Sequence, residues 1–354
     1  MFSIKTTKLQ EMVSKAIKGA GSNKLIPLTN LMAMQVKDNK FTIITTDGNN
    51  YLYITDDVAS EDFYVVTEVD TFAKLVAKMT CESINLEIKG NLLEVRGNGT
   101  YSIALPLENG EIIKYPDPYN TSDLGTSLGT ISIDVIGTIL TTLKPSLAVT
   151  MENPCYTGYY VGDNVIATDT EQIAALDTKL FNIPQLISCE MMNLLNVVTD
   201  STVDAYLSAN HVILVSNHVV VYGAVLNGIE SYQVDAIKGF LTQDFPSVCK
   251  LPKAELLQVL DRIALFVDVF DAGAITLDFT NDGLTISNQN MSGTELIPYL
   301  SNEAKTEFTG TVDINVLRSQ VKAQAGDSIT LHYGDDKSIK IKDDKVTVVM
   351  ALLA

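Results

Sequence analysis

The stretch Asp38-Asn39-Lys40-Phe41-Thr42-Ile43-Ile44-Thr45-Thr46-Asp47 decides the fold, because a version of it occurs three times in the chain. The second version is Gly162-Asp163-Asn164-Val165-Ile166-Ala167-Thr168-Asp169, and the third is Asn281-Asp282-Gly283-Leu284-Thr285-Ile286-Ser287. Each is a polar turn leading into a run rich in β-branched residues, which is typical of a strand after a tight turn. Each third also ends in an alternating segment that predicts two strands, at 83–97, 201–217 and 327–344. The sequence therefore predicts three similar domains rather than a solenoid, whose repeats span only about 20 to 50 residues.

Six further segments carry apolar residues at helical spacing, two in each third of the chain. Thr7 followed by Gln10 predicts a capping box at the first of them. Two helices and many short alternating strands per repeat predict an α+β fold, with both helices on one face of an antiparallel sheet. We expect domains at 1–123, 124–245 and 246–354, each of an ordinary size for a compact domain. The helical segments are Leu9-Met12-Val13-Ala16, Phe72-Leu75-Val76-Met79, Ile136-Ile139-Leu140-Leu143, Met191-Leu194-Leu195-Val198, Leu256-Val259-Leu260-Ile263 and Ile314-Leu317-Val321.

Composition and targeting signals narrow the class of protein. The cysteines Cys81, Cys155, Cys189 and Cys249 are far apart and form no Cys-x-x-Cys pair, so they indicate neither a disulfide framework nor a zinc site. The N-terminus lacks the apolar core of a signal peptide, and no window approaches the about 18 apolar residues of a membrane span. We therefore expect a soluble cytoplasmic protein with no membrane partner, no metal ion and no cofactor.

No motif or cluster indicates catalysis. The chain has no Gly-x-Gly-x-x-Gly, Walker loop, Gly-x-Ser-x-Gly or His-Glu-x-x-His motif. His211, His218 and His332 lie in strand-like runs and are interpreted as ordinary strand residues. The pairs Thr46-Asp47 and Thr168-Asp169 recur at the same place in two repeats, so a structural turn at a strand end explains them better than an acid/base pair. The sequence thus predicts a protein that is not an enzyme.

The net charge of −18 argues against nucleic-acid binding over the whole surface, because phosphate binding depends on lysine and arginine. Many bases nevertheless lie on the polar faces of the predicted helices. This pattern has two interpretations: the ordinary solvated faces of amphipathic helices, or a locally basic set of helices within an acidic protein. The residues concerned are Lys8, Lys15, Lys74, Lys78, Lys144, Lys253, Arg318 and Lys322, with Lys24 in the loop after the first helix.

Several landmarks occur in a characteristic order along the chain. They are Ile26-Pro27-Leu28-Thr29-Asn30-Leu31, the turn at 37–40 leading to Thr45-Thr46-Asp47, the segments 96–106 and 165–174, and the C-terminal Val348-Val349-Met350. In this order, and with the triplication, the whole chain resembles the bacterial β sliding clamp of DNA polymerase III. The resemblance implies three two-helix clamp domains per chain and two chains closed head to tail into a ring. It also implies a processivity factor that encircles double-stranded DNA, with the helix bases touching phosphates without reading sequence.

The resemblance further implies a hydrophobic pocket between the second and third domains, where the DNA polymerase and clamp-loader subunits insert short peptide motifs. This sequence departs from the family there, since Thr170, Glu171 and Gln172 stand where the family has glycine, histidine and arginine. We therefore expect weaker binding of a standard clamp-binding peptide. The alternative is that the C-terminal strand only completes the third sheet. The pocket residues implied are Tyr156, Thr168, Thr170, Gln172, Ile173, Val348, Met350, Ala351 and Leu352.

The implied interface between the two chains of the homodimer is apolar. Tyr101 and Ile103 match an edge strand of the first domain, and Leu265 and Phe266 match the facing helix end of the third. Two alternatives from other classes stay open. One is a ring- or tube-forming structural protein without a DNA role, and the other is a hydrolase that uses the duplicated carboxylates.

Overall fold

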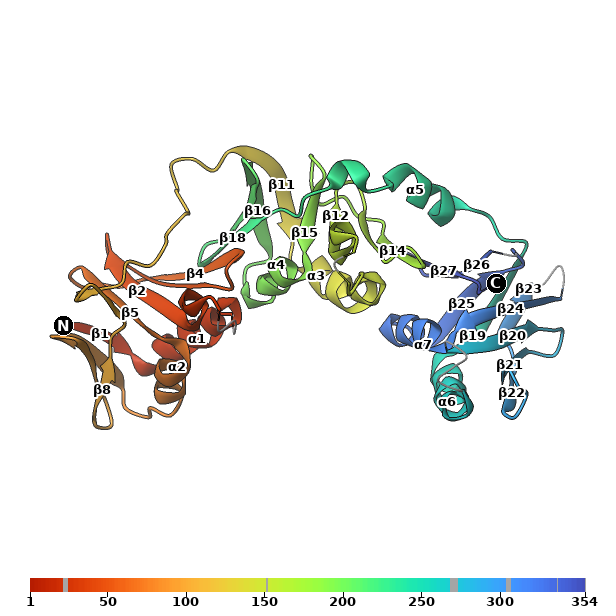
Figure 1. The fold of residues 1–354 in the computed structure, drawn as a ribbon, viewed down its shortest axis with the longest axis horizontal. Coiled ribbons are helices and arrows are strands. Elements are labelled where there is room, and N and C mark those ends of the chain that lie inside the picture. The colour runs from red at the N-terminus through yellow and green to blue at the C-terminus, as the bar shows by residue number, and fades with distance from the viewer. Residues whose placement is uncertain (22–24, 151, 268–272, 304–306, 336, 354) are drawn as a thin grey trace. The chain divides into compact units, whose positions relative to one another are not determined.

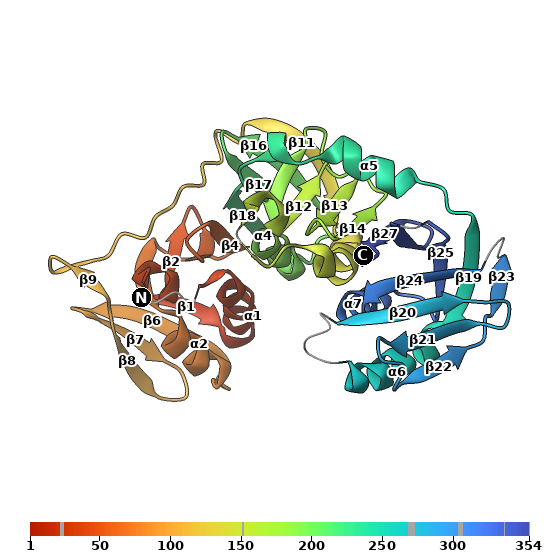
Figure 2. The same cartoon turned by 45° about the vertical axis from the view of Figure 1, so that its right-hand side comes forward.

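The computed structural model describes residues 1–21, 25–150, 152–267, 273–303, 307–335 and 337–353. The chain divides into two compact units, and Figures 1 and 2 label their helices and strands. Unit 1 comprises Met1–Ile136 and Glu190–Val225, and unit 2 comprises Gly137–Cys189 and Leu226–Ala354. The predicted α+β fold is confirmed, since helices pack on antiparallel sheets in both units.

Unit 1 contains an eight-stranded sheet, a four-stranded sheet and a two-stranded ribbon of β9 (Leu107–Glu108) and β10 (Glu111–Ile112). Its helices are α1 (Thr6–Ala16), α2 (Val69–Ala77) and most of α4 (Cys189–Leu194). The eight-stranded sheet has the order β11 (Thr126–Ser132), β16 (Thr202–Ser208), β17 (His211–Val215), β18 (Val219–Ala224), β4 (Asn50–Asp57), β3 (Lys40–Thr46), β2 (Leu31–Lys37), β5 (Phe63–Glu68). The four-stranded sheet has the order β1 (Phe2–Lys5), β6 (Ser83–Lys89), β7 (Leu92–Arg96), β8 (Thr100–Ala104).

Unit 2 contains a nine-stranded and a four-stranded sheet. α3 (Asp134–Thr138) begins in unit 1 and continues into the π-helical turn η3 (Ile139–Leu143) and the 3₁₀ turn η4 (Lys144–Ser146) of unit 2, whose other helices are α5 (Val234–Thr242), α6 (Lys253–Ile263) and α7 (Ile314–Ala323). The larger sheet has the order β15 (Gln185–Ser188), β12 (Gly158–Val161), β13 (Val165–Thr168), β14 (Gln172–Leu176), β27 (Val346–Ala351), β26 (Ser338–Lys342), β25 (Ser328–Tyr333), β19 (Ser247–Pro252), β23 (Ser301–Glu303). The smaller sheet has the order β22 (Thr294–Ile297), β21 (Leu284–Asn288), β20 (Ala274–Phe279), β24 (Phe308–Asp313).

The strand order repeats three times, which confirms the predicted triplication. One four-strand pattern occurs as β1-β6-β7-β8, β11-β16-β17-β18 and β19-β25-β26-β27. A second occurs as β5-β2-β3-β4, β15-β12-β13-β14 and β24-β20-β21-β22. Patterns of the two kinds are joined edge to edge at β18–β4 and at β14–β27. The boundaries 1–123, 124–245 and 246–354 stay a prediction, because these joined sheets carry the contacts from one repeat to the next.

Each of the six predicted segments forms a helix, although Met79 and Val198 lie just beyond the helix ends, and most of the apolar stripe residues are buried. Leu9, Met12, Val13 and Ala16 of α1 are buried, as are the stripe residues of α6. The capping box is wrong, because the amide of Gln10 instead donates to carbonyls at the end of α2 and the N-cap makes no side-chain bond. Gln10 thus joins the two helices of the first repeat.

The helix α5 was not predicted. Val234, Ile237 and Leu241 have helical spacing and pack on the cluster around Tyr160 and Tyr232. Ile173 of β14 packs on that same cluster, whereas the adjacent Gln172 bonds to α7. Successive strand residues point to opposite faces, so α5 and α7 cover opposite faces of the nine-stranded sheet, as Figure 1 shows.

Candidate functional site

A hydrogen-bonded turn follows β3 in the first repeat and β13 in the second. The hydroxyl of Thr168 donates to the carbonyl of Gln172 over 2.7 Å, and one oxygen of Asp169 accepts the amides of Glu171 and Gln172 at 3.0 and 2.9 Å. Thr46 and Asp47 make the same bonds in the first repeat. The interpretation of both Thr-Asp pairs as structural turns is confirmed, since their carboxylates close a turn.

A groove lies beside the second of these turns, in unit 2. It has a volume of about 580 Å³ and runs between the turn, the segment after η4 and the first turns of α7. Its apolar lining includes Leu147, which is buried, and Val149, whose side chain is 98% exposed at the rim. The lining residues are Pro145, Leu147, Ala148, Val149, Thr150, Asp169, Glu171, Gln172, Asn315, Val316 and Ser319.

A buried chain of amide hydrogen bonds fixes the floor of this groove to α7. The amide nitrogen of Gln172 donates to Asp169 at 2.7 Å and to the carbonyl of Pro145 at 3.0 Å. Both acceptors lack hydrogens, so the oxygen of Gln172 must face the amide nitrogen of Gln320, 2.6 Å away. Gln320 is fully buried and also donates to Ser146 at 2.8 Å. The bonds therefore run in one direction, from α7 to the turn.

Most residues of the implied pocket lie on β13, β14 and β27, on two faces of the sheet, while Tyr156 lies in η5 (Pro154–Thr157), Thr170 in the β13–β14 turn and Leu352 after β27. Thr168 and Ile173 are opposite each other on the face that α5 covers. Gln172 is opposite Met350, on the face that α7 covers. Tyr156 packs on the α5 cluster, Val348 and Met350 are buried, Leu352 is half-buried, and Thr170 and Ala351 are exposed. Of this set, only Gln172 lines the groove.

Sequence reasoning missed the groove residues on η4 and α7. The sequence assigned no functional role to Pro145, and Val316 lies within the Ile314-Leu317-Val321 pattern, which has only three apolar residues at helical spacing. Their contact with the Thr168–Gln172 turn depends on the packing of α7 against η3 and η4. No local pattern in the sequence marks these residues, because single exposed apolar residues such as Val149 are common on protein surfaces.

β8 in unit 1 and β22 in unit 2 are sheet edges, each with one neighbouring strand, at the places in the repeated pattern where the other repeats are joined as β18–β4 and β14–β27. Tyr101 on β8 is 41% exposed, while Ile103 is buried. Leu265 and Phe266, in η8 (Ala264–Phe266) after α6, are 81% and 52% exposed. The predicted interface residues thus lie at or near the open edges of the two smaller sheets.

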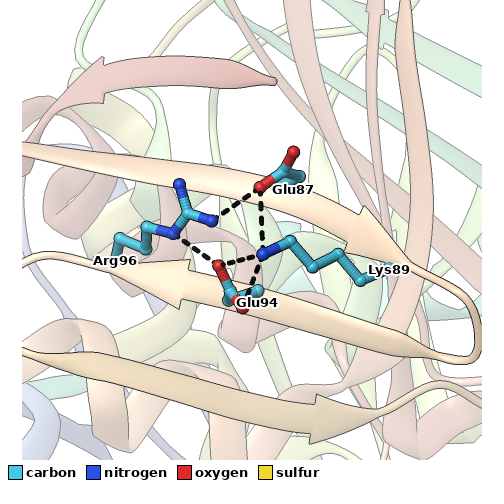
Figure 3. A network of polar contacts seen from close by, with 4 residues as sticks. All are labelled: Glu87, Lys89, Glu94 and Arg96. Carbon is cyan, nitrogen blue, oxygen red and sulfur yellow. Dashed lines mark hydrogen bonds and ion pairs between the residues drawn. The ribbon is translucent and has the colours of Figure 1, made fainter.

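The four-stranded sheet that contains β8 carries a network of charged side chains on β6 and β7 (Figure 3). Glu94 lies between Lys89, at 3.0 Å, and Arg96, and Arg96 also pairs with Glu87 at 2.9 Å. The hydrogen bond from Lys89, followed by that from Arg96, holds the pKa of Glu94 below its ordinary value. Glu87 and Glu94 are directly opposite on neighbouring strands, where like charges repel, and the two bases offset that repulsion.

The predicted DNA-binding lysines and arginine differ in whether other side chains or carbonyls of the chain already bind them. Lys8 pairs with Asp56, Lys15 with Glu11, Lys74 with Asp70 and Arg318 with Asp261, while Lys253 donates to carbonyls at the end of α7. Lys24 lies outside the described residues. Within the described ranges, Lys78, Lys144 and Lys322 are exposed and make no ion pair, so they have the most freedom to contact an anion.

Two classes of site are not seen in the part of the chain that the structure describes. No group of three or more His, Cys, Asp or Glu side chains is placed to hold a metal ion there. None of the described helices is long and apolar enough to cross a membrane. None of the four cysteines forms a disulfide within the described residues.

No protein-family model matches the sequence, and none of the curated proteins matches it. Solved structures match it over its whole length. The DNA polymerase sliding clamp of Bacillus subtilis is 17% identical, with a TM-score of 0.85 over 99% of this chain and 98% of that one. The chain has the fold of a bacterial sliding clamp. The DNA polymerase III beta chain of Streptococcus pneumoniae agrees, with 14% identity, 99% of both chains covered and a TM-score of 0.86.

A third sliding-clamp structure extends the likeness to another lineage. The beta subunit of DNA polymerase III from Borrelia burgdorferi, in complex with a natural product, is 15% identical, with a TM-score of 0.85 over 100% of this chain and 99% of that one. The clamp fold expected from the order of the sequence landmarks is confirmed. The fold is shared with these structures at 14–17% sequence identity.

Proposed function

We propose that the chain is a DNA sliding clamp, a non-catalytic processivity factor that encircles duplex DNA as a closed homodimer and tethers a DNA polymerase. The observation that carries this proposal is that β8 and β22 are open edges at the two places of the repeated pattern whose counterparts are joined within the chain, as β18–β4 and β14–β27. An unpaired edge strand exposes a row of backbone donors and acceptors and is a template for pairing. A second copy, joined head to tail, would pair both edges in both chains.

The two joins within the chain predict the register of the join between copies. At β18–β4, Val221 is opposite Leu52, and at β14–β27, Val348 is opposite Ala174. When the hairpins are aligned on their turns, β8 takes the place of β18 and β27, and β22 takes the place of β4 and β14. Both joins then give one answer: Tyr101 opposite Glu295, Ser102 opposite Thr294, and Ile103 opposite Gly293.

This register brings the predicted interface residues together. A Cβ built on Gly293 would lie 3.3 Å from the Phe266 ring and from Ile263. Ile103 of the second copy, opposite Gly293, would therefore pack over Phe266, while Tyr101 would lie over Glu295 and its partner Arg262. Burial of the exposed apolar surface of Leu265 and Phe266 supports closure, at roughly 25 cal/mol per Å² of apolar area.

The distribution of charge suits a clamp that stays on DNA because it encircles the duplex, and not because it binds the duplex tightly. A net charge of −18 disfavours tight wrapping of DNA, while exposed bases on helices can contact phosphates weakly and without sequence preference. We assign this contact first to Lys78, Lys144 and Lys322, because ion pairs offset the charge of Lys8, Lys15, Lys74 and Arg318. A tethered polymerase then acts at high effective concentration without any new base contact.

We place the partner site for polymerase and clamp-loader segments at the groove beside the Thr168–Gln172 turn. Its mixture of apolar residues and a few polar groups suits a short peptide. An aspartate in place of Met350 is a poor test, because Met350 is buried in the sheet and an unpaired buried carboxylate would unfold unit 2. Val316→Asp is better, since Val316 is half-buried and lines the groove.

A covalent closure experiment tests the ring. The double variant Ser102→Cys, Thr294→Cys places one cysteine on each edge at directly opposed positions in the proposed register. Oxidation in the presence of a relaxed circular plasmid should give a cross-linked dimer that stays on the plasmid in high salt and leaves when the plasmid is cut. Each single variant is the control, because neither can close a ring through both edges.

The outcomes separate the candidate functions. A protein that light scattering finds strictly monomeric at micromolar concentration, and that does not cross-link, contradicts the homodimer. Cross-linked dimers that never remain on circular DNA contradict the clamp and favour a structural ring. Cross-linking together with release on cutting supports topological retention, because salt removes electrostatic binding but cannot unlink two closed rings.

A further inference from the structure

The groove beside the Thr168–Gln172 turn carries acidic side chains that a bound ligand would meet. The inference from them rests on the proposal that this groove is the partner site. Asp169 and Glu171 line one side of the groove, and none of the described lining residues is a lysine or arginine. The remaining walls are apolar or uncharged, with Leu147, Val149 and Val316 among them. A ligand that fills the groove therefore meets apolar surface and two carboxylates.

The charge of Asp169 is held in place without being neutralised. Its oxygens accept three hydrogen bonds, all from uncharged donors: the amides of Glu171 and Gln172 and the side-chain nitrogen of Gln172. Gln172 is itself oriented by the buried Gln320, whose amide nitrogen faces its oxygen. An uncharged amide positions a carboxylate but leaves its full charge, whereas a basic residue at 172 would have formed an ion pair.

Glu171 adds a second charge at the same edge. Its backbone is fixed, since its amide donates to Asp169 and its carbonyl accepts from Ala351 at 2.9 Å. Its side chain is exposed and belongs to none of the ion pairs within the described residues. Two uncompensated carboxylates beside an apolar groove favour a cation at the position that an apolar ligand presents to them.

We propose that the groove selects an apolar peptide segment that carries a lysine or arginine, and rejects one that carries an acidic residue at the same place. The occupant is a segment of a partner protein whose apolar side chains cover Leu147, Val149 and Val316 and whose cationic side chain faces Asp169 and Glu171. Glu171 is the residue that sets this preference, and Gln172 and Gln320 position the carboxylate of Asp169. An acidic partner segment meets like charges, which supplies rejection as well as selection.

Calorimetric titration with two capped pentapeptides, Leu-Ser-Lys-Leu-Leu and Leu-Ser-Glu-Leu-Leu, tests the preference on the full-length chain. An exposed ion pair changes affinity by about two- to fivefold, so exchange of attraction for repulsion gives a preference for the lysine peptide of about tenfold at low salt. Glu171→Lys should remove or reverse this preference. Asp344→Lys, an identical charge change at an exposed turn outside the groove, should keep it.

Each outcome bears on a different statement. Our inference is overturned if Asp344→Lys lowers the preference for the lysine peptide as much as Glu171→Lys does, because the net charge of −18 would then explain the preference. Equal binding of both peptides to the unmodified chain also overturns the inference but leaves the partner site standing. If Val316→Asp abolishes binding, the site is supported, whereas binding of neither peptide to the unmodified chain contradicts the site and the inference together.

Discussion

Replacement of Thr170 with glycine should stabilise unit 2, because Thr170 occupies a backbone conformation that suits glycine. Its φ angle is +85°, and the residue at the same place in the first repeat is Gly48, with φ of +102°. The surrounding hydrogen bonds are the same in both turns, since the amides of Thr170 and Gly48 each donate to the preceding threonine hydroxyl. The β-branched side chain of Thr170 is therefore held in a region that L residues rarely adopt.

The change in the free energy of unfolding caused by Thr170→Gly follows from two opposing contributions, backbone strain and conformational entropy. A non-glycine residue held at such an angle costs of order 1–3 kcal/mol, whereas glycine loses about 0.5–1 kcal/mol more in conformational entropy on folding. Thr170→Gly should therefore raise the free energy of unfolding by about 1 kcal/mol, or the Tm of a unit of this size by about 2–4 °C. Thr170 is exposed, so loss of its side chain removes little packing.

Scanning calorimetry of the full chain measures the effect, with Gly48→Thr as the matched control in unit 1. A Cβ at Gly48 meets Ile26 at 3.5 Å and Thr29 at 3.8 Å, which are ordinary contacts, so the control tests backbone strain alone. Gly48→Thr should lower the stability of unit 1 by a similar amount. An unchanged or lowered Tm for Thr170→Gly would refute the assignment of strain to this turn.

Three further predictions concern the interface, the acid stability and a buried lysine. Leu265→Asp should leave the chain folded but convert the dimer to monomer in light scattering, because Leu265 is 81% exposed before assembly. The pKa of Glu94 is lowered, so its stabilising effect is present above its ordinary pKa of 4.5 and is lost as pH falls through the lowered value. In urea unfolding at a series of acid pH values, Glu94→Gln should therefore lose less stability on acidification than the unmodified chain. An equal loss of stability in both proteins would contradict this. Lys340 donates to the carbonyls of Leu241 and Gln243, so Lys340→Met should cost about 1–3 kcal/mol in urea unfolding, and a loss below 0.5 kcal/mol would be evidence against this role.

Much of the fold could be predicted from local patterns. The threefold turn-and-strand motif, the alternation of the hairpins and the apolar stripes of six helices each depend on residues close in sequence, where period and turn chemistry carry the information. The helix α5 could have been found in the same way, since Val234, Ile237 and Leu241 have helical spacing. The capping box failed because Gln10 found better partners at the end of α2, which no local pattern reveals.

The sequence by itself determined the three repeats, the helices, the strands and the structural role of the Thr-Asp turns. Only the tertiary structure decided the groove, because its walls come from η4, the β13–β14 turn and α7, far apart in the chain. Alternation along a strand already separates Ile173 from Gln172, but only the structure decided that α5 covers the face of Ile173 and α7 the face of Gln172. The order of the strands likewise depends on pairing over long distances, and that order is what leaves β8 and β22 open.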